Sequence, residues 1–238
     1  MFPPVSLSQA SLATAIGLSA AGIWAGTTPP NPSPDKEPAT GDSIRWTVTL
    51  QQKYGNVMYL ALGAAACRHI AMVCTYPNVP SWLLRHASAN GLNPGLFTWS
   101  KDTAIPLALI LAGASLRLLS YGALGRNFTF GLQEPDKLNT TGLYRYIQHP
   151  SYSGLLAIAA GIMGLWGRAD GIVSCLLPPA WYASLRQVEP VLQSIVFASI
   201  ISVISRRVKD EEEMLHGQFG KQWEDWHSRT ARFVPFLF

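Results

Sequence analysis

The sequence predicts an all-α fold, a polytopic bundle of transmembrane helices with about five crossings. Hydrophobic residues make up 48% of the 238 residues and charged residues only 13%, whereas a soluble domain carries about 25% charged residues. A bilayer core about 30 Å thick needs around 20 mostly apolar residues per helical crossing. Several stretches reach that length. The net charge of +4 comes without the basic stripe of a nucleic-acid binder, which argues against a nucleic-acid partner.

The first three crossings are predicted in the N-terminal half. Val5–Gly26 lacks the basic start of a signal peptide and exceeds its usual apolar length of about 7–15 residues, so a retained helix is favoured. The second crossing is predicted at Tyr54–Thr75 and the third at Asp102–Tyr121. Between the first two, prolines recur through Thr27–Asp42. Because each proline removes a backbone donor and fixes φ, this segment is expected to be a solvated linker.

Residues 150–205 are interpreted as two crossings rather than three, with Pro178, Pro179 and Pro190 kinking or breaking the second. An even number is needed if the polar segments before and after them share one side of the membrane. Five crossings then place the N-terminus in the lumen and the C-terminus in the cytosol, with most basic residues of these segments on the cytosolic side.

Two domains are predicted from this organisation. Residues 1–121 form the N-terminal transmembrane helices with the linker at 27–42, and residues 122–238 form the functional core. Arg117 lies near the end of the third crossing and is expected to extend its charge to the membrane surface. The cysteines, Cys67, Cys74 and Cys175, lack metal-ligand spacing, so we expect buried side chains and no metal site.

A polar, glycine-rich stretch from Leu124 to Gly154 follows the third predicted crossing. It alternates aromatic rings, hydrogen-bonding side chains and glycines, which suits the wall of a pocket for a flat, polar cofactor. An interfacial loop with a belt of aromatic side chains would have the same composition. Composition alone therefore leaves both interpretations open.

A second polar stretch, Arg206–Trp223, begins where the last apolar block ends. Arg207 and Glu211 are four residues apart, so a helix would place this cation and anion on one face. The alternative is an amphipathic helix on the membrane surface, with inserted tryptophans and an ordinary ion pair worth roughly 0.2–0.5 kcal/mol.

At these two stretches the sequence resembles the isoprenylcysteine carboxyl methyltransferase family. The resemblance spans roughly Gly125 to Phe236, and two motifs in the right order make it specific. The residues that match are Gly142, Tyr144, His149, Pro150, Tyr152 and Gly154 in the first motif, and Arg207, Glu211, Glu212, Phe219, Gly220, Trp223, Thr230, Arg232 and Pro235 in the second. Trp223 stands where the family usually has tyrosine, and Gln148 where many members carry a basic residue.

The resemblance implies an endoplasmic-reticulum enzyme that transfers a methyl group from S-adenosylmethionine to the carboxylate of a prenylated cysteine. Arg207 and Glu211 would be catalytic, with Arg207 binding the substrate carboxylate and Glu211 orienting Arg207. A C-terminal helix on the cytosolic side would cap the cofactor pocket. The residues implied to bind S-adenosylmethionine are Gln133, Leu138, Tyr144, His149, Pro150, Ser151, Tyr152 and Glu211.

Three other functions stay open at this point. A methyltransferase of the same fold could act on a terpenoid, another lipid carboxylate or an amine, although an amine would not favour an arginine beside it. A membrane sterol reductase would use NADPH, but no basic cluster suits its 2′-phosphate. A membrane scaffold without activity would not need Arg207, Glu211 and His149.

Overall fold

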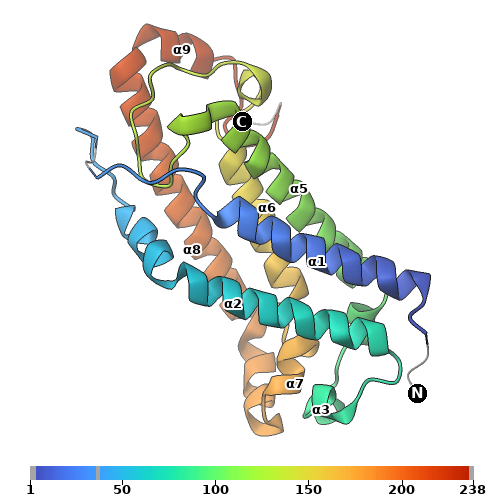
Figure 1. Cartoon of the computed structure of the whole chain (residues 1–238). Helices are drawn as coiled ribbons and strands as arrows, with labels where there is room; N and C mark the ends of the chain where they lie inside the picture. The colour runs from blue at the N-terminus through green and yellow to red at the C-terminus, as the bar shows by residue number, and fades with distance from the viewer. Residues whose placement is uncertain (1–3, 36–37, 236–238) are drawn as a thin grey trace. The chain divides into compact units, whose positions relative to one another are not determined.

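The computed structural model describes residues 4–35 and 38–235. Residues 1–3, 36–37 and 236–238 of the predicted domains, and with them the Phe236 end of the family resemblance, lie outside the described residues. The helices, labelled as in Figure 1, are α1 (Leu7–Thr27), α2 (Arg45–Thr75), α3 (Ser81–Leu84), α4 (Ala87–Asn90), α5 (Lys101–Leu124), α6 (Pro150–Leu165), α7 (Ser174–Leu176), α8 (Pro179–Phe219) and α9 (Lys221–His227). Short 3-10 turns lie at Pro94–Phe97, Gly125–Asn127 and Gly142–Arg145, and a wider turn at Ala169–Val173.

The all-helical fold with five membrane-spanning candidates is confirmed. By length and composition, the candidates among the described residues are Leu7–Thr27, Arg45–Thr75, Lys101–Asn127, Pro150–Leu176 and Pro179–Phe219. Helices suit these stretches because a bilayer offers no partners to the backbone, which must satisfy its own hydrogen bonds. Large apolar side chains such as Leu60 and Ile195 point outward, 75% and 58% exposed, as expected of surfaces that face lipid.

The predicted pair of crossings between residues 150 and 205 matches these candidates, and the prolines act unequally. Pro178 separates α7 from α8, and α8 begins at Pro179, where a missing N–H costs no helical bond. Pro190 lies inside α8 without ending it. The second crossing starts earlier than predicted, because the polar piece from Arg45 continues directly into α2.

The described residues form two compact units, each of which combines parts of several helices. The first contains residues 4–24, Val57–Ala112 and Ala157–Ala198. The second contains Ala25–Asn56, Gly113–Leu156 and the described residues from Ser199 onward. The functional division expected at residues 121 and 122 stays a prediction.

Close helix packing in the second unit explains one glycine of the first motif. A Cβ on Gly154 of α6 would come within 2.6 Å of the Gly113 carbonyl oxygen of α5. Small residues let helix backbones approach closely in membranes. Gly154 is therefore needed for packing rather than for a chemical step.

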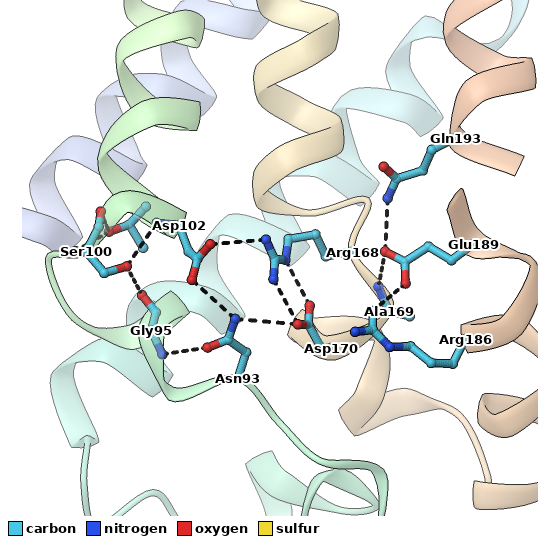
Figure 2. Close-up of polar contacts among 11 residues, drawn as sticks. Asn93, Gly95, Ser100, Asp102, Arg168, Ala169, Asp170, Arg186, Glu189 and Gln193 are labelled. Atoms are coloured by element: carbon cyan, nitrogen blue, oxygen red, sulfur yellow. Dashed lines mark hydrogen bonds and ion pairs between the residues drawn. The ribbon is translucent and has the colours of Figure 1, made fainter. Parts of the chain in front are cut away.

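A polar network ties together three segments of the first unit (Figure 2). Arg168 donates two hydrogen bonds to the carboxylate of Asp170, at 2.8 and 2.9 Å, and reaches Asp102 at 3.3 Å. The Asn93 side chain lies 3.4 Å from both carboxylates. Glu189 of α8 accepts a hydrogen bond from the Ala169 amide at 3.1 Å. The network thus holds the turn before α7 against the start of α5 and against α8.

We expect Asp170→Asn to lower the thermal unfolding midpoint of the detergent-solubilised protein. The Asp170 side chain is 12% exposed, and loss of a charged hydrogen-bonding partner in such a place costs about 1–3 kcal/mol. The matched control is Asp136→Asn, whose pair with Arg126 is 67% and 87% exposed and worth about 0–1 kcal/mol. Equal midpoints for Asp170→Asn and Asp136→Asn would contradict a stabilising role for this network.

Two sequence expectations are wrong in detail. Arg117 does not extend to the membrane surface: it is 4% exposed, and its guanidinium donates to the Ser151 hydroxyl at 3.0 Å and to the Tyr121 hydroxyl at 3.0 Å. It also donates to the Gly26 carbonyl. Of the cysteines, Cys175 is buried as expected, but Cys67 is exposed, because it lies on an outward face of α2.

Candidate active site

A pocket in the second unit is lined by both of the predicted polar stretches. It encloses about 800 Å³ of space when its open mouth is counted. Its walls come from the segment between α5 and α6, from the start of α6, and from α8 and α9. The lining residues are Leu124, Asn127, Phe128, Thr129, Gly131, Leu132, Gln133, Pro135, Lys137, Leu138, Asn139, Tyr144, Gln148, His149, Ser151, Tyr152, Arg207, Glu211, Met214, Leu215 and Trp226.

Nearly all of the predicted site residues meet in this pocket. Arg207 and Glu211 line it, as do Gln133, Leu138, Tyr144, His149, Ser151 and Tyr152. Pro150 does not, since it is buried as the first residue of α6. Proline is favoured at this place in a helix, so its position explains its presence without a ligand contact.

Apolar contacts place the loop after α5 on helix α8. Leu132 is 2% exposed and packs with Met214 and Leu215, and Leu138 packs against the same cluster. Burial of a leucine side chain stabilises by about 1.5–3 kcal/mol. One wall of the pocket is therefore apolar and held by packing.

The first motif begins with a tight turn, Gly142–Arg145, beside the pocket. Gly142 has φ of +59°, a left-handed conformation that favours glycine. The turn buries Tyr144, whose carbonyl accepts a hydrogen bond from the indole of Trp226 at 2.8 Å. Burial raises the pKa of Tyr144, so its hydroxyl stays protonated at neutral pH and can donate a hydrogen bond.

Trp226, three residues beyond the second stretch, bears on the alternative in which that stretch lies on the membrane surface with inserted tryptophans. A helix lying on the membrane would insert this tryptophan into lipid, but its side chain is buried and lines the pocket. This residue of α9 is therefore part of the pocket wall.

Histidine and acidic side chains form a second cluster at the start of α6. The His149 side chain is 2% exposed, with Nε2 at 3.2 Å from Glu212 and Nδ1 at 4.0 Å from Glu211. Glu212 also pairs with Arg232 at 2.9 Å. Tyr152 donates a hydrogen bond to Glu211 at 2.8 Å. These contacts join α6, α8 and the C-terminal segment around one end of the pocket.

The predicted pairing of Arg207 with Glu211 is wrong. The guanidinium instead lies 2.7 Å from the Asp42 carboxylate, and Glu211 bonds to Tyr152. Tyr152 links the two groups, because its hydroxyl also accepts a hydrogen bond from Arg207 Nε at 3.3 Å. Residues four apart lie on one helix face, so Arg207 and Glu211 could have paired. Their side-chain rotamers instead direct them to Asp42 and Tyr152, which belong to other segments.

Comparison with known proteins shows which family the chain resembles. The model of the phospholipid methyltransferase family matches residues 102–199. A probable protein-S-isoprenylcysteine O-methyltransferase from Oryza sativa subsp. indica is 25% identical over 160 residues, which cover 65% of this chain and 72% of the relative. The protein-S-isoprenylcysteine O-methyltransferase B of Arabidopsis thaliana is 29% identical over 136 residues, covering 55% and 58%.

The chain is a membrane methyltransferase like those of the isoprenylcysteine carboxyl methyltransferase family. The resemblance predicted from the two motifs is thereby confirmed. A solved structure of a eukaryotic intramembrane Ras methyltransferase also matches this methyltransferase, with 19% identity and a TM-score of 0.45, over 93% of this chain and 74% of the other.

Sequence reasoning missed the contribution of the proline-rich linker to this methyltransferase. Between Thr28 and Asp35 and between Pro38 and Asp42 the segment has no helix, as predicted, but it is only partly solvated. Its Asn31 side chain donates to the Gly125 and Phe128 carbonyls, both at 2.8 Å, and Ser33 accepts from the Gly131 amide at 2.9 Å. Asp42 at its end is buried. Its prolines disfavour a helix but do not prevent the segment from packing against the loop between α5 and α6, which lines the pocket.

Gln148 was assigned no role, and the structure shows what it contacts. Its side-chain nitrogen donates to the Thr230 carbonyl at 2.7 Å and to the His227 carbonyl at 3.1 Å, and its oxygen lies 2.8 Å from His227 Nδ1. These bonds attach His227 and Thr230, near the C-terminus, to Gln148, the residue that precedes His149 of the first motif. A lysine or arginine, which cannot accept a hydrogen bond, would not make all of them.

Proposed function

We propose that this protein transfers a methyl group from S-adenosylmethionine to the C-terminal carboxylate of a prenylated cysteine, forming a methyl ester. The observation that carries the proposal is a buried guanidinium, Arg207, and a carboxylate, Glu211, lining one pocket with aromatic and amide groups. The relatives named for isoprenylcysteine methylation support the choice of acceptor.

The pocket has groups suited to the cofactor. Glu211 carries a negative charge toward a cationic ligand, while Tyr144 and Trp226 offer aromatic surface and Gln133 and Asn139 offer amides. In the proposed reaction the methyl carbon of the sulfonium forms a bond to the carboxylate oxygen as its bond to sulfur breaks, so the products are an ester and a thioether and no proton moves. The protein therefore needs no strong general base.

The task of the protein is to bind, orient and dehydrate the acceptor. The planar guanidinium of Arg207 can hold a carboxylate in a defined direction and keeps its charge at every physiological pH. Its side chain is 7% exposed, which favours removal of water from the acceptor before transfer. Glu211, fixed by Tyr152, would counter the positive charge of the cofactor.

We further propose a multi-pass location in the endoplasmic-reticulum membrane with a cytosolic C-terminus. On that side α9 would cap the cofactor pocket, and the acceptor, a prenylated protein C-terminus or another lipid carboxylate, would enter from the membrane lipid. The five apolar helices support membrane insertion.

The proposed function predicts base-labile labelling of a prenylcysteine. Purified protein in detergent is incubated with methyl-labelled S-adenosylmethionine and N-acetyl-farnesylcysteine, with N-acetylcysteine as the control acceptor. We expect label in the farnesylated compound that mild alkali releases, because methyl esters hydrolyse under these conditions. Absence of transfer to any prenylcysteine would refute the proposed acceptor.

One observation favours a second candidate, methylation of a phospholipid amine. The family model that matches residues 102–199 is that of phospholipid methyltransferases. The matched region ends before Arg207 and Glu211, and a guanidinium is a poor neighbour for an amine that must lose a proton. The same assay with phosphatidylethanolamine separates the two functions, since a methylated amine keeps its label in alkali.

A further inference from the structure

The Arg207 side chain is held by three segments of the second unit. Besides Tyr152 at 3.3 Å, it donates to the Phe130 carbonyl at 2.9 Å and lies 2.7 Å from the carboxylate of Asp42. Only Asp42 among these partners carries a charge. A buried guanidinium without a counter-charge is strongly unfavourable, so Asp42 is the partner that allows Arg207 to be buried here.

Asp42 stands behind the pocket wall rather than in the pocket. Its side chain is 0% exposed and is not part of the lining, whereas Arg207 and Leu132, which it contacts, both are. The same oxygen of Asp42 that faces Arg207 accepts a hydrogen bond from the Leu132 amide at 2.9 Å. One carboxylate thus joins helix α8 to the loop between α5 and α6, and residues of both line the pocket.

The charge of Asp42 is maintained by its surroundings. Burial by itself would raise the pKa of Asp42, but the ion pair with the Arg207 guanidinium and the hydrogen bond from the Leu132 amide outweigh burial and lower the pKa. The carboxylate is therefore ionised at neutral pH, and its attraction fixes the guanidinium in one orientation.

The neighbouring residues keep Asp42 in this place. The Ser43 amide and hydroxyl both bond to Asp210 of α8, at 2.9 and 2.5 Å. Asn31 and Ser33 attach the earlier part of the segment to the loop after α5. The segment is thus anchored both to α8 and to the loop between α5 and α6.

We propose that Asp42 is a positioning residue that orients Arg207 toward the acceptor carboxylate, so that the segment between α1 and α2 belongs to the active site. The proposal rests on the proposed function, in which Arg207 binds that carboxylate. It adds a residue that lies outside both motifs. Asp42 does not touch the acceptor itself.

The test is Asp42→Asn, which keeps the size of the side chain and removes its charge. We expect kcat/KM for N-acetyl-farnesylcysteine to fall about 10- to 100-fold, because an unfixed guanidinium binds the acceptor in fewer productive orientations. The Kd of S-adenosylmethionine, measured by calorimetry, is expected to change less than about twofold, which also shows that the variant is folded. The matched control is Asp35→Asn, the same change of charge at an exposed aspartate of this segment, with both constants expected within about twofold of wild type.

A spectroscopic measurement separates this proposal from the proposed function. In protein labelled with ¹⁵N-arginine, the Arg207 Nε–H resonance, assigned with Arg207→Lys, should shift in Asp42→Asn and exchange with water at least about tenfold faster. If wild type methylates no prenylcysteine, the proposed function fails and this resonance alone decides the role of Asp42. An unchanged resonance overturns the positioning role, and so does an unchanged kcat/KM in an active enzyme.

Discussion

Replacing Arg207 with alanine is expected to reduce methyl transfer to N-acetyl-farnesylcysteine by roughly 100- to 1,000-fold, the usual cost of removing one electrostatic contact to a reacting oxygen. Arg207 is a buried cation of the pocket lining. Without it the carboxylate would lose its binding partner while the sulfonium methyl stays available. The affinity for S-adenosylmethionine should therefore change by less than about threefold.

Two further variants make the Arg207 experiment specific. Arg206→Ala removes the preceding, exposed arginine of α8 and should leave activity near that of wild type. Arg207→Lys keeps a charge beside Asp42 but loses the planar fork, so an intermediate activity is expected. If Arg207→Ala weakens cofactor binding as much as methyl transfer, the separate role assigned to Arg207 is wrong.

The second large effect is expected for His149→Ala, which should weaken S-adenosylmethionine binding about tenfold or more in a calorimetric titration. His149 lines the pocket, and its side chain is 2% exposed beside Glu212. Its removal would leave a hole in the pocket wall and take one partner from Glu212, whose other partner, Arg232, belongs to the C-terminal segment.

The matched control for His149 lies on α8 outside the pocket. His216 pairs with Glu224 at 2.9 Å, and its side chain is 51% exposed. His216→Ala should therefore bind the cofactor with the affinity of wild type. An unchanged affinity in His149→Ala would show that the histidine of the first motif does not contact or shape the cofactor site.

The two motif stretches could be placed from the sequence, but their contacts could not. Spacing put Arg207 and Glu211 on one helix face, and both line the same pocket. Spacing also suggested that they pair, whereas Asp42 and Tyr152 are their partners. A period of 3.6 residues sets the direction of a side chain, and the rotamer is then decided by whatever charge the rest of the fold brings near.

Arg117 shows the same limit at a membrane boundary. An arginine near the end of an apolar helix usually extends to the surface. Here the helix packs so closely at Gly154 that Arg117 is enclosed and donates to Ser151 and Tyr121. Whether an arginine faces outward or inward depends on the neighbouring helix, which the local sequence does not reveal.

The sequence by itself determined the helical membrane fold and the family. Stretches of apolar residues long enough for a bilayer must become helices, because each backbone group then finds its partner within the same stretch. The two motifs are likewise local patterns. Only the tertiary structure decided that the proline-rich segment supplies Asp42 to Arg207. That pairing joins residues far apart in the chain, and it forms because a guanidinium buried by packing needs an opposite charge.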